Sequence, residues 1–203
     1  MKPQHRVFTQ NQMLLHAVHE AGHAIVAVYL KIGFQKTFIA RKPFRLGRNW
    51  IAGLCETNEG FSYRSYKQTI DKNGAEIFVE TDVAALKRDF YRKHIIICYA
   101  GRVAEEMLFN AEPNGGDRID LQIIKSLKRA GKFSTEDLKS FRQRAQQILR
   151  KSFVFKGLLF TAHELTETLI LTSSAVRGHL RVGRNTSPET FETWKAGFEA
   201  ISS

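Results

Sequence analysis

Two histidines and a glutamate near the start of the chain have the spacing of a metal-dependent hydrolase. His19, Glu20 and His23 form an HExxH element. On a helix, residues four apart lie on one face, so His19 and His23 can present their imidazoles to one metal ion. Zinc suits such a site, because neutral imidazole is a good zinc ligand and a tetrahedral ion keeps a position for water. Glu20 could take the proton of that water, which predicts hydrolysis as the chemistry.

The residues around this motif favour a metal site over two ordinary core histidines. Most of them are apolar: Met13, Leu14, Leu15, Ala17, Val18, Ala21, Ala24, Ile25, Val26, Val28 and Leu30. A helix that is apolar nearly all round is buried. Burial of two imidazoles and a carboxylate costs free energy unless they are paired or bound, and a metal ion removes that cost. We therefore predict one Zn²⁺ per chain on a buried helix from about Asn11 to Leu30, with Asn11 as its N-cap.

The third protein ligand of such a zinc ion remains open on the residues alone. Carboxylates in or after a long predicted helix and three isolated histidines are the candidates: Glu105, Glu106, Asp117, Asp120, His94, His163 and His179. His16 lies one turn before His19, but a His16–His19 pair would misplace Glu20. We expect His16 at most to lie beside the site and orient a ligating imidazole.

Composition indicates an ordinary globular chain of one domain. The 203 residues are 43% hydrophobic and 25% charged, and neither the N-terminus nor any apolar run predicts a signal peptide or a membrane span. Cys55 and Cys98 are too few and too isolated for a disulfide framework, so a reduced, cytoplasmic protein without membrane insertion is expected. The net charge is +11. Residues 121–160 carry ten Lys or Arg against Glu136 and Asp137, a segment that could attract an acidic partner or nucleic acid.

The order of predicted elements is mainly helical. Strands are expected at Thr37–Ala40 and Asn49–Cys55, a loop or flap over Glu56–Asn73, and a short strand at Ile77–Glu80. A long helix follows to about Phe109, with Gly101 explained by close approach of the HExxH helix. Later helices are expected from Asp120, from Ser134 or Thr135, from Leu158 to about Leu171, and from Pro188 to Ile201. This pattern predicts a mainly α (α+β) domain with a small sheet beside the HExxH helix.

Three ordered blocks resemble the peptidase domain of the FtsH-type AAA+ zinc proteases. The HExxH block is followed by Tyr99–Phe109 (YAGRVAEEMLF), which is similar to the family's GGRxAEE block. Gly116–Leu121 (GDRIDL) is similar to its GAxNDL block, although Ile119 stands where asparagine is usual. The resemblance covers roughly residues 11–130. It implies a zincin-like catalytic core there, preceded by a flexible arm at 1–10 and followed by C-terminal helices at 131–203.

The resemblance also implies roles for particular residues. It makes Asp120 the third zinc ligand, beside His19 and His23. Glu105 becomes a residue that could orient a ligating imidazole. A strand at the edge of the sheet would hold an extended substrate, and its place corresponds to Trp50, Ile51, Ala52, Gly53 and Leu54.

The expected function is an ATP-independent zinc metalloendopeptidase acting on unfolded or flexible polypeptides. The family's ATPase domain and membrane anchor have no counterpart here, since the sequence contains no GxxxxGK[ST] phosphate loop. Family members form rings, so a homo-oligomer is possible. The alternative is a basic, nucleic-acid-associated regulatory protein in which zinc is structural or regulatory. A degenerate peptidase that only binds peptides is disfavoured by the intact Glu20.

Overall fold

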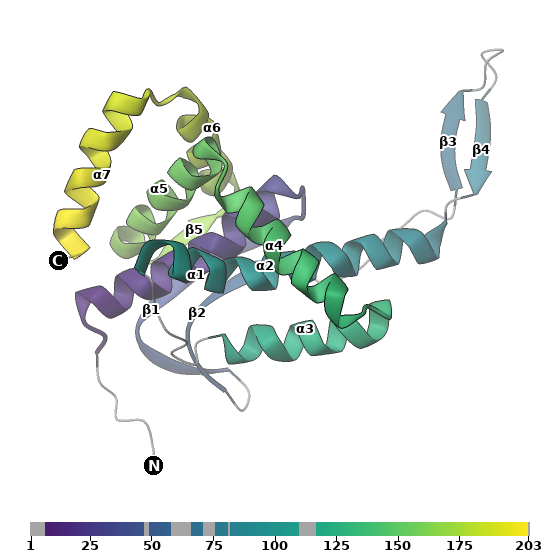
Figure 1. The fold of residues 1–203 in the computed structure, drawn as a ribbon, viewed down its shortest axis with the longest axis horizontal. Coiled ribbons are helices and arrows are strands. Elements are labelled where there is room, and N and C mark those ends of the chain that lie inside the picture. The colour runs from purple at the N-terminus through teal and green to yellow at the C-terminus, as the bar shows by residue number, and fades with distance from the viewer. Residues whose placement is uncertain are drawn as a thin grey trace.

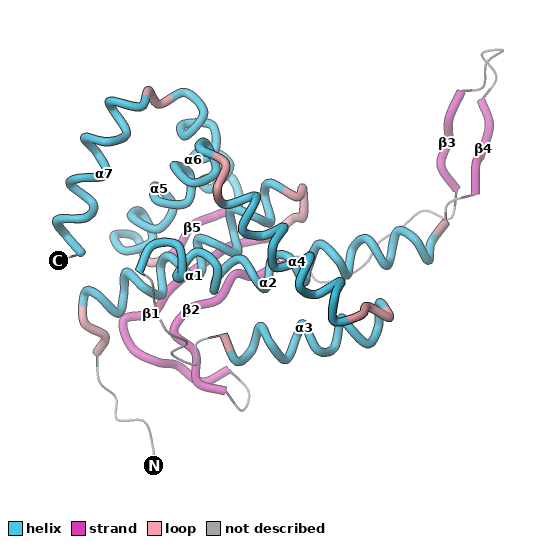
Figure 2. Tube along the Cα trace, in the orientation of Figure 1, coloured by secondary structure: helices cyan, strands magenta, loops and turns pink. Residues whose placement is uncertain are grey.

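The chain folds into a mainly helical structure with a small antiparallel sheet, as predicted (Figures 1 and 2). The computed structural model describes residues 7–46, 49–57, 66–70, 76–80, 82–109 and 117–202. The elements in chain order are α1 (Gln10–Tyr29), β1 (Phe34–Leu46), β2 (Asn49–Thr57), β3 (Tyr66–Ile70), β4 (Glu76–Glu80), α2 (Val83–Phe109), α3 (Arg118–Gly131), α4 (Thr135–Leu149), α5 (Ser152–Thr168), β5 (Ile170–Thr172), α6 (Ser173–Asn185) and α7 (Pro188–Ser202). None of the described helices is both long and apolar enough to cross a membrane.

Helix α1 carries the HExxH motif through the centre of the molecule. Residues 17–27 are all buried, which confirms the prediction from its apolar sequence. The N-cap, however, is Thr9 rather than Asn11. The Thr9 hydroxyl accepts from the Gln12 N–H, and the Gln12 side chain accepts from the Thr9 N–H, so two donors at the helix start are satisfied together. Of the predicted arm at 1–10, Gln10 is helical and the Phe8 N–H donates to the Arg41 carbonyl.

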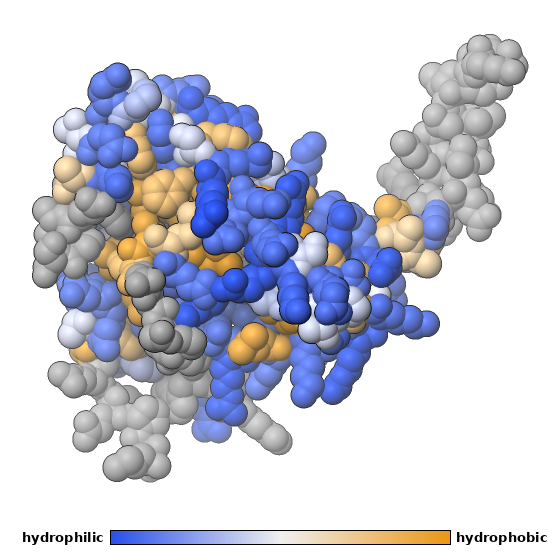
Figure 3. All heavy atoms as spheres, viewed as in Figure 1, coloured by the Kyte–Doolittle hydropathy of each residue, from blue (hydrophilic) through white to orange (hydrophobic). Residues whose placement is uncertain are grey.

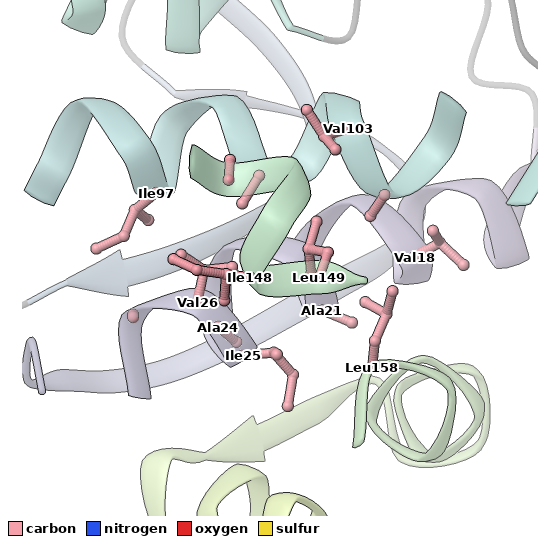
Figure 4. Close-up of a cluster of buried hydrophobic side chains, with 14 of the residues drawn as sticks. Val18, Ala21, Ala24, Ile25, Val26, Ile97, Val103, Ile148, Leu149 and Leu158 are labelled. Carbon is pink, nitrogen blue, oxygen red and sulfur yellow. The ribbon is translucent and has the colours of Figure 1, made fainter. Parts of the chain in front are cut away.

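The hydrophobic core lies around α1, which contacts α2, α5 and strands β1 and β2. Figure 4 shows Val18, Ile25 and Val26 of α1 among side chains from other helices, including Ile97, Val103, Ile148, Leu149 and Leu158. Helix α1 approaches α2 very closely. A Cβ added at Gly22 would lie 2.7 Å from the Ala100 carbonyl oxygen, so only glycine fits there. Because α1 is packed on several sides, His19 and His23 are only 7% and 6% exposed.

The three-stranded sheet beside α1 has the order β2–β1–β5, with antiparallel pairing throughout. The predicted strands at 37–40 and 49–55 are confirmed, but β1 is longer. It continues through Pro43, where the register with β2 shifts between Ile39 and Phe44. Strand β2 is paired on one side only among the described residues, so it forms an edge of the sheet.

Strands β3 and β4 form a separate hairpin between β2 and α2, standing away from the other elements (Figure 1). The prediction of a loop over Glu56–Asn73 is therefore wrong in two places. Residues 56–57 belong to β2 and residues 66–70 to β3. Residues 58–65 and 71–73 of that prediction lie outside the described residues. The predicted strand at Ile77–Glu80 is confirmed as β4.

The C-terminal half is more helical than predicted. Helix α4 begins after Ser134, whose hydroxyl accepts from the Asp137 N–H, as its sequence indicates. Helix α5 begins at Ser152 rather than Leu158, and it ends at Thr168 because Leu169 takes a left-handed φ of 66°. The prediction of helix up to Leu171 is wrong, since strand β5 follows at once. Helix α6 was not predicted at all.

Candidate metal centre

Helices α1 and α3 bring two histidines and one aspartate together. The Nε2 atoms of His19 and His23 are 3.0 Å apart, and Asp120 Oδ2 lies 3.1 Å from the first and 3.2 Å from the second. These three residues are the one group of potential metal ligands found among the described residues. The arrangement is the one that the sequence resemblance implies, with Asp120 meeting the HExxH histidines across a gap of about a hundred residues.

The spacing of these three atoms suits zinc. Zinc binds imidazole nitrogen and carboxylate oxygen at about 2.0–2.2 Å, and in a tetrahedron such bonds place neighbouring ligand atoms roughly 3.3–3.5 Å apart. The three observed separations of 3.0–3.2 Å are close to that edge length. Two imidazoles and one carboxylate also form the donor set of many catalytic zinc sites, which leaves one position for water or substrate.

Hydrogen bonds at the far side of each imidazole orient the two histidines. The His19 Nδ1–H donates to Glu105 Oε1 at 3.0 Å, and the His23 Nδ1–H donates to the Ile97 carbonyl oxygen at 2.7 Å. Each bond fixes the tautomer with its lone pair on Nε2, facing the shared centre. Glu105 therefore stands where the sequence analysis expected a residue that orients an imidazole.

Gly101 provides the space in which the two imidazoles meet. A Cβ at this position would lie 2.6 Å from His23 Nε2 and 2.8 Å from His19 Nε2. No side chain could occupy that space without displacing both rings. The explanation of Gly101 by close approach of the HExxH helix is thus confirmed, and the contact is with the candidate ligands themselves.

Glu20 lies beside the three ligands with one carboxylate oxygen unsatisfied. The residue is 8% exposed, and its Oε2 has no hydrogen-bond partner among the described residues. Burial raises the pKa of Glu20, although His23 and His19 oppose this shift. A buried polar atom without a partner is rare, and its presence fits a site made for a further ligand. A carboxylate with a raised pKa is also well suited to accept and return a proton near neutral pH.

Charges at the centre favour a bound cation. Burial alone would lower the pKa values of His19 and His23, but Asp120 raises both, and Glu105 helps to raise that of His19. Burial would raise the pKa of Asp120, yet the two histidines hold it well below its usual range. The carboxylates of Glu20, Glu105 and Asp120 thus surround two imidazoles in a poorly hydrated space. Glu105 is paired with Arg102, so the carboxylates of Glu20 and Asp120 are the ones that a divalent cation would balance.

Strand β2 lies directly against Glu20. A Cβ at Gly53 would lie 2.7 Å from Glu20 Cγ and 2.9 Å from Glu20 Oε1. Gly53 is part of the stretch Trp50–Leu54 that was proposed as a substrate edge, and the strand is indeed at an edge of the sheet. The structure therefore brings a strand edge and a carboxylate together beside the three candidate ligands.

The other histidines considered as ligands are outside this group. The His16 ring packs against Phe8, with ring centroids 4.6 Å apart, and burial lowers its pKa to about 4. His19 and Glu105 lie within electrostatic range of it, so His16 borders the site. The remaining three have partners of their own, which are Phe90 for His94, Trp194 for His163, and Thr161 with Glu164 for His179.

Two features of the site escaped the sequence analysis. Cys55 and Cys98, far apart in the sequence, both lie near the centre, and burial raises the pKa of each thiol, with Asp120 contributing. A series of ion pairs also leads from Glu105 through Arg102 and Glu106 to Arg142 on α4. A partial signal for the second feature exists in the sequence, because Arg102 and Glu106 are four apart on one helix.

Comparisons with known proteins leave the site to be interpreted on its geometry. No protein-family model matches the chain, and a search of curated proteins finds no significant relative.

Proposed function

We propose that the protein is a zinc metalloendopeptidase with an FtsH-like catalytic core. One observation carries the proposal. The carboxylate of Glu20 stands between a triangle of zinc-type ligands and the edge strand β2, with one oxygen unsatisfied. A structural zinc site closes its coordination with protein ligands, and it needs neither a free carboxylate nor an exposed strand edge beside it.

The proposed mechanism assigns each residue one task. His19, His23 and Asp120 would hold Zn²⁺, which supplies Lewis acidity toward a water molecule and the scissile carbonyl. Glu20 accepts the proton of the attacking water and returns it to the leaving amine. Glu105 and the Ile97 carbonyl keep both imidazoles in the ligating tautomer.

The proposed substrates are unfolded or flexible polypeptides. An edge strand has free backbone N–H and C=O groups, which pair with an extended peptide whatever its side chains. Gly53 contacts Glu20, so a peptide paired along β2 would pass close to the general base. A folded substrate could not present its backbone in this way. Free cysteines at Cys55 and Cys98 are compatible with work in the cytoplasm.

Cleavage of unfolded casein tests this proposal with two variants. Glu20→Gln keeps the size of the side chain but removes the base, so it should bind zinc normally and lose at least about 100-fold in cleavage rate. Asp120→Ala should lose both zinc, measured by elemental analysis, and cleavage. Wild-type activity should be the same with and without ATP. Undiminished turnover by Glu20→Gln would rule out the general-base role, and undiminished zinc in Asp120→Ala would rule out that ligand.

A basic surface supports a second candidate function, binding to nucleic acid. Mostly hydrophilic side chains cover the face that carries α3 and α4 (Figure 3). The exposed cations of α3, α4 and the residues that follow each helix include Lys125, Arg129, Lys132, Arg144, Arg150 and Lys151. None of these forms an ion pair with a carboxylate among the described residues. Retention of duplex DNA by both wild type and Glu20→Gln, lost as salt is raised, would favour this function. Absence of retention at low salt would exclude it.

A further inference from the structure

A continuous series of charged side chains connects the surface of α4 to the candidate ligand His19. Arg142 on α4 donates to Glu106 Oε2, and Glu106 Oε1 accepts from Arg102 Nε at 3.0 Å. Arg102 Nη1 then donates to Glu105 Oε2 at 3.3 Å. Glu105 completes the series, because its other oxygen accepts from the His19 Nδ1–H at 3.0 Å.

Burial increases along this series toward the site. The side chain of Arg142 is 46% exposed and that of Glu106 33%, whereas Arg102 is 11% and Glu105 only 4% exposed. Ion pairs at an exposed surface contribute little, since water and salt screen them. The inner pair is different, because a buried carboxylate without a cationic partner would be costly. Arg102 is thus the cationic partner of the buried Glu105 carboxylate beneath His19.

The geometry of Arg102 also restricts how Glu105 can turn. The guanidinium uses two of its nitrogens at once, Nε for Glu106 and Nη1 for Glu105. A planar group held at both ends has little freedom to rotate. The Glu105 carboxylate, held by Arg102 on one oxygen, then presents the other oxygen to His19 in one orientation.

We propose that Arg102 is a positioning residue, which acts through Glu105 to hold His19 with its Nε2 toward the metal. Glu106, which is itself paired with Arg142 on α4, anchors the guanidinium of Arg102. This inference rests on the proposed metal site but does not require peptide cleavage. The competing explanation is that Arg102 only joins α2 to α4, in which case metal binding would not depend on it.

Zinc affinity is the measurement that separates these two explanations. Arg102→Met removes the charge but keeps much of the side-chain volume, and it should weaken zinc binding roughly tenfold in a chelator competition at pH 7.5. Arg92→Met is the matched control, because Arg92 pairs with Asp89 on an exposed part of the same helix. This control should bind zinc like the wild type. The melting temperature of each metal-free variant reports whether the fold is kept.

A double variant tests whether Arg102 acts through Glu105. If it does, Glu105→Gln alone and Glu105→Gln with Arg102→Met should bind zinc within about twofold of each other, since the second change has nothing left to act on. Independent, additive losses would overturn the proposal, as would wild-type zinc affinity in Arg102→Met. If Arg102→Met does not fold, Glu106→Gln serves instead. It should weaken zinc roughly threefold, and unchanged affinity would likewise overturn the proposal.

The zinc-affinity test of Arg102 and the casein-cleavage test of the proposed function can fail independently of each other. Weaker zinc binding in Arg102→Met, together with a wild type that does not cleave casein, would keep the positioning role and remove the peptidase. Casein cleavage by the wild type, together with unchanged zinc affinity in Arg102→Met, would keep the peptidase and remove the positioning role.

Discussion

Single residues at the centre are placed by contacts that allow few substitutions. Gly101 and Gly53 lie against the ligands and against Glu20, so that even a methyl group at either position would meet them within 3 Å. His16, one turn before His19, is different, because its ring packs on Phe8 and it is not part of the ligand group found among the described residues. Burial of the His16 imidazole should therefore make the stability of the fold depend on pH.

The protonation of His16 predicts a loss of stability in mild acid. Burial lowers the pKa of His16 from 6.5 to about 4 in the folded chain, so between these values the unfolded chain binds more protons than the folded one. Stability should then fall as the pH falls below 6.5. His16→Gln should lose about 1–2 kcal/mol less than the wild type between pH 7.5 and pH 5. Urea unfolding of the metal-free proteins measures this, and equal losses would show that His16 plays no part.

At the scale of elements, close approach between helices decides where glycine is required. Helices α1 and α2 meet at Gly22 and Gly101, and α5 and α6 meet at Gly183. A Cβ at Gly183 would lie 2.5 Å from the Phe153 carbonyl oxygen and 3.1 Å from the Gly157 nitrogen. Both are backbone atoms, which cannot move aside cheaply. Gly178 lies on the same helix, yet nothing is found within 4 Å of a Cβ there.

Alanine at these two glycines of α6 should change the free energy of unfolding in opposite directions. Gly183→Ala should force the two helices apart and lower the free energy of unfolding by about 1–3 kcal/mol. Gly178→Ala should raise it by about 0.5–1 kcal/mol, because alanine restricts the unfolded chain and favours helix. Thermal or urea unfolding of both variants measures the difference. Equal effects of the two substitutions would contradict the packing of α5 against α6.

At the scale of the molecule, the candidate metal centre joins segments far apart in the chain. His19 and His23 belong to α1, and Asp120 lies in the first turn of α3. Helix α3 otherwise packs mainly on α2 and exposes Leu121 and Ile123. A metal ion at the centre would therefore tie α3 to the core that α1 forms.

Removal of the metal should accordingly destabilise the whole fold. A ligand that binds only the folded chain adds about 4 kcal/mol when present at a thousand times its dissociation constant. EDTA should lower the melting temperature of the wild type and abolish cleavage, while added zinc, but not magnesium, should restore both. Asp120→Ala should melt at the same temperature with or without EDTA. A wild-type melting temperature that does not respond to EDTA would exclude a metal that supports the fold.

Local sequence patterns were sufficient to predict the helices that have clear apolar spacing or clear cap residues. The burial of α1, the length of α2 and the capped start of α4 follow from apolar spacing and cap residues. Helix α6 was missed although Thr172 caps it and Val176, Leu180 and Gly183 are buried at helical spacing. Leu169 and Ile170, just before α6, continue the apolar pattern of α5. The end of α5 is therefore marked only by the left-handed backbone of Leu169, which apolar spacing does not predict.

The placing of two imidazoles and a carboxylate on one buried helix follows from the HExxH spacing alone, because every helix has the same period. Residue types alone left the third ligand open, and the resemblance that favoured Asp120 could not give its distance from the histidines. Three contacts become visible in the folded chain alone. Asp120 completes the group with His19 and His23, Gly53 of an edge strand touches Glu20, and Arg102 pairs with Glu105. These contacts join residues distant in the chain, and they depend on how helices and strands pack, which no local pattern encodes.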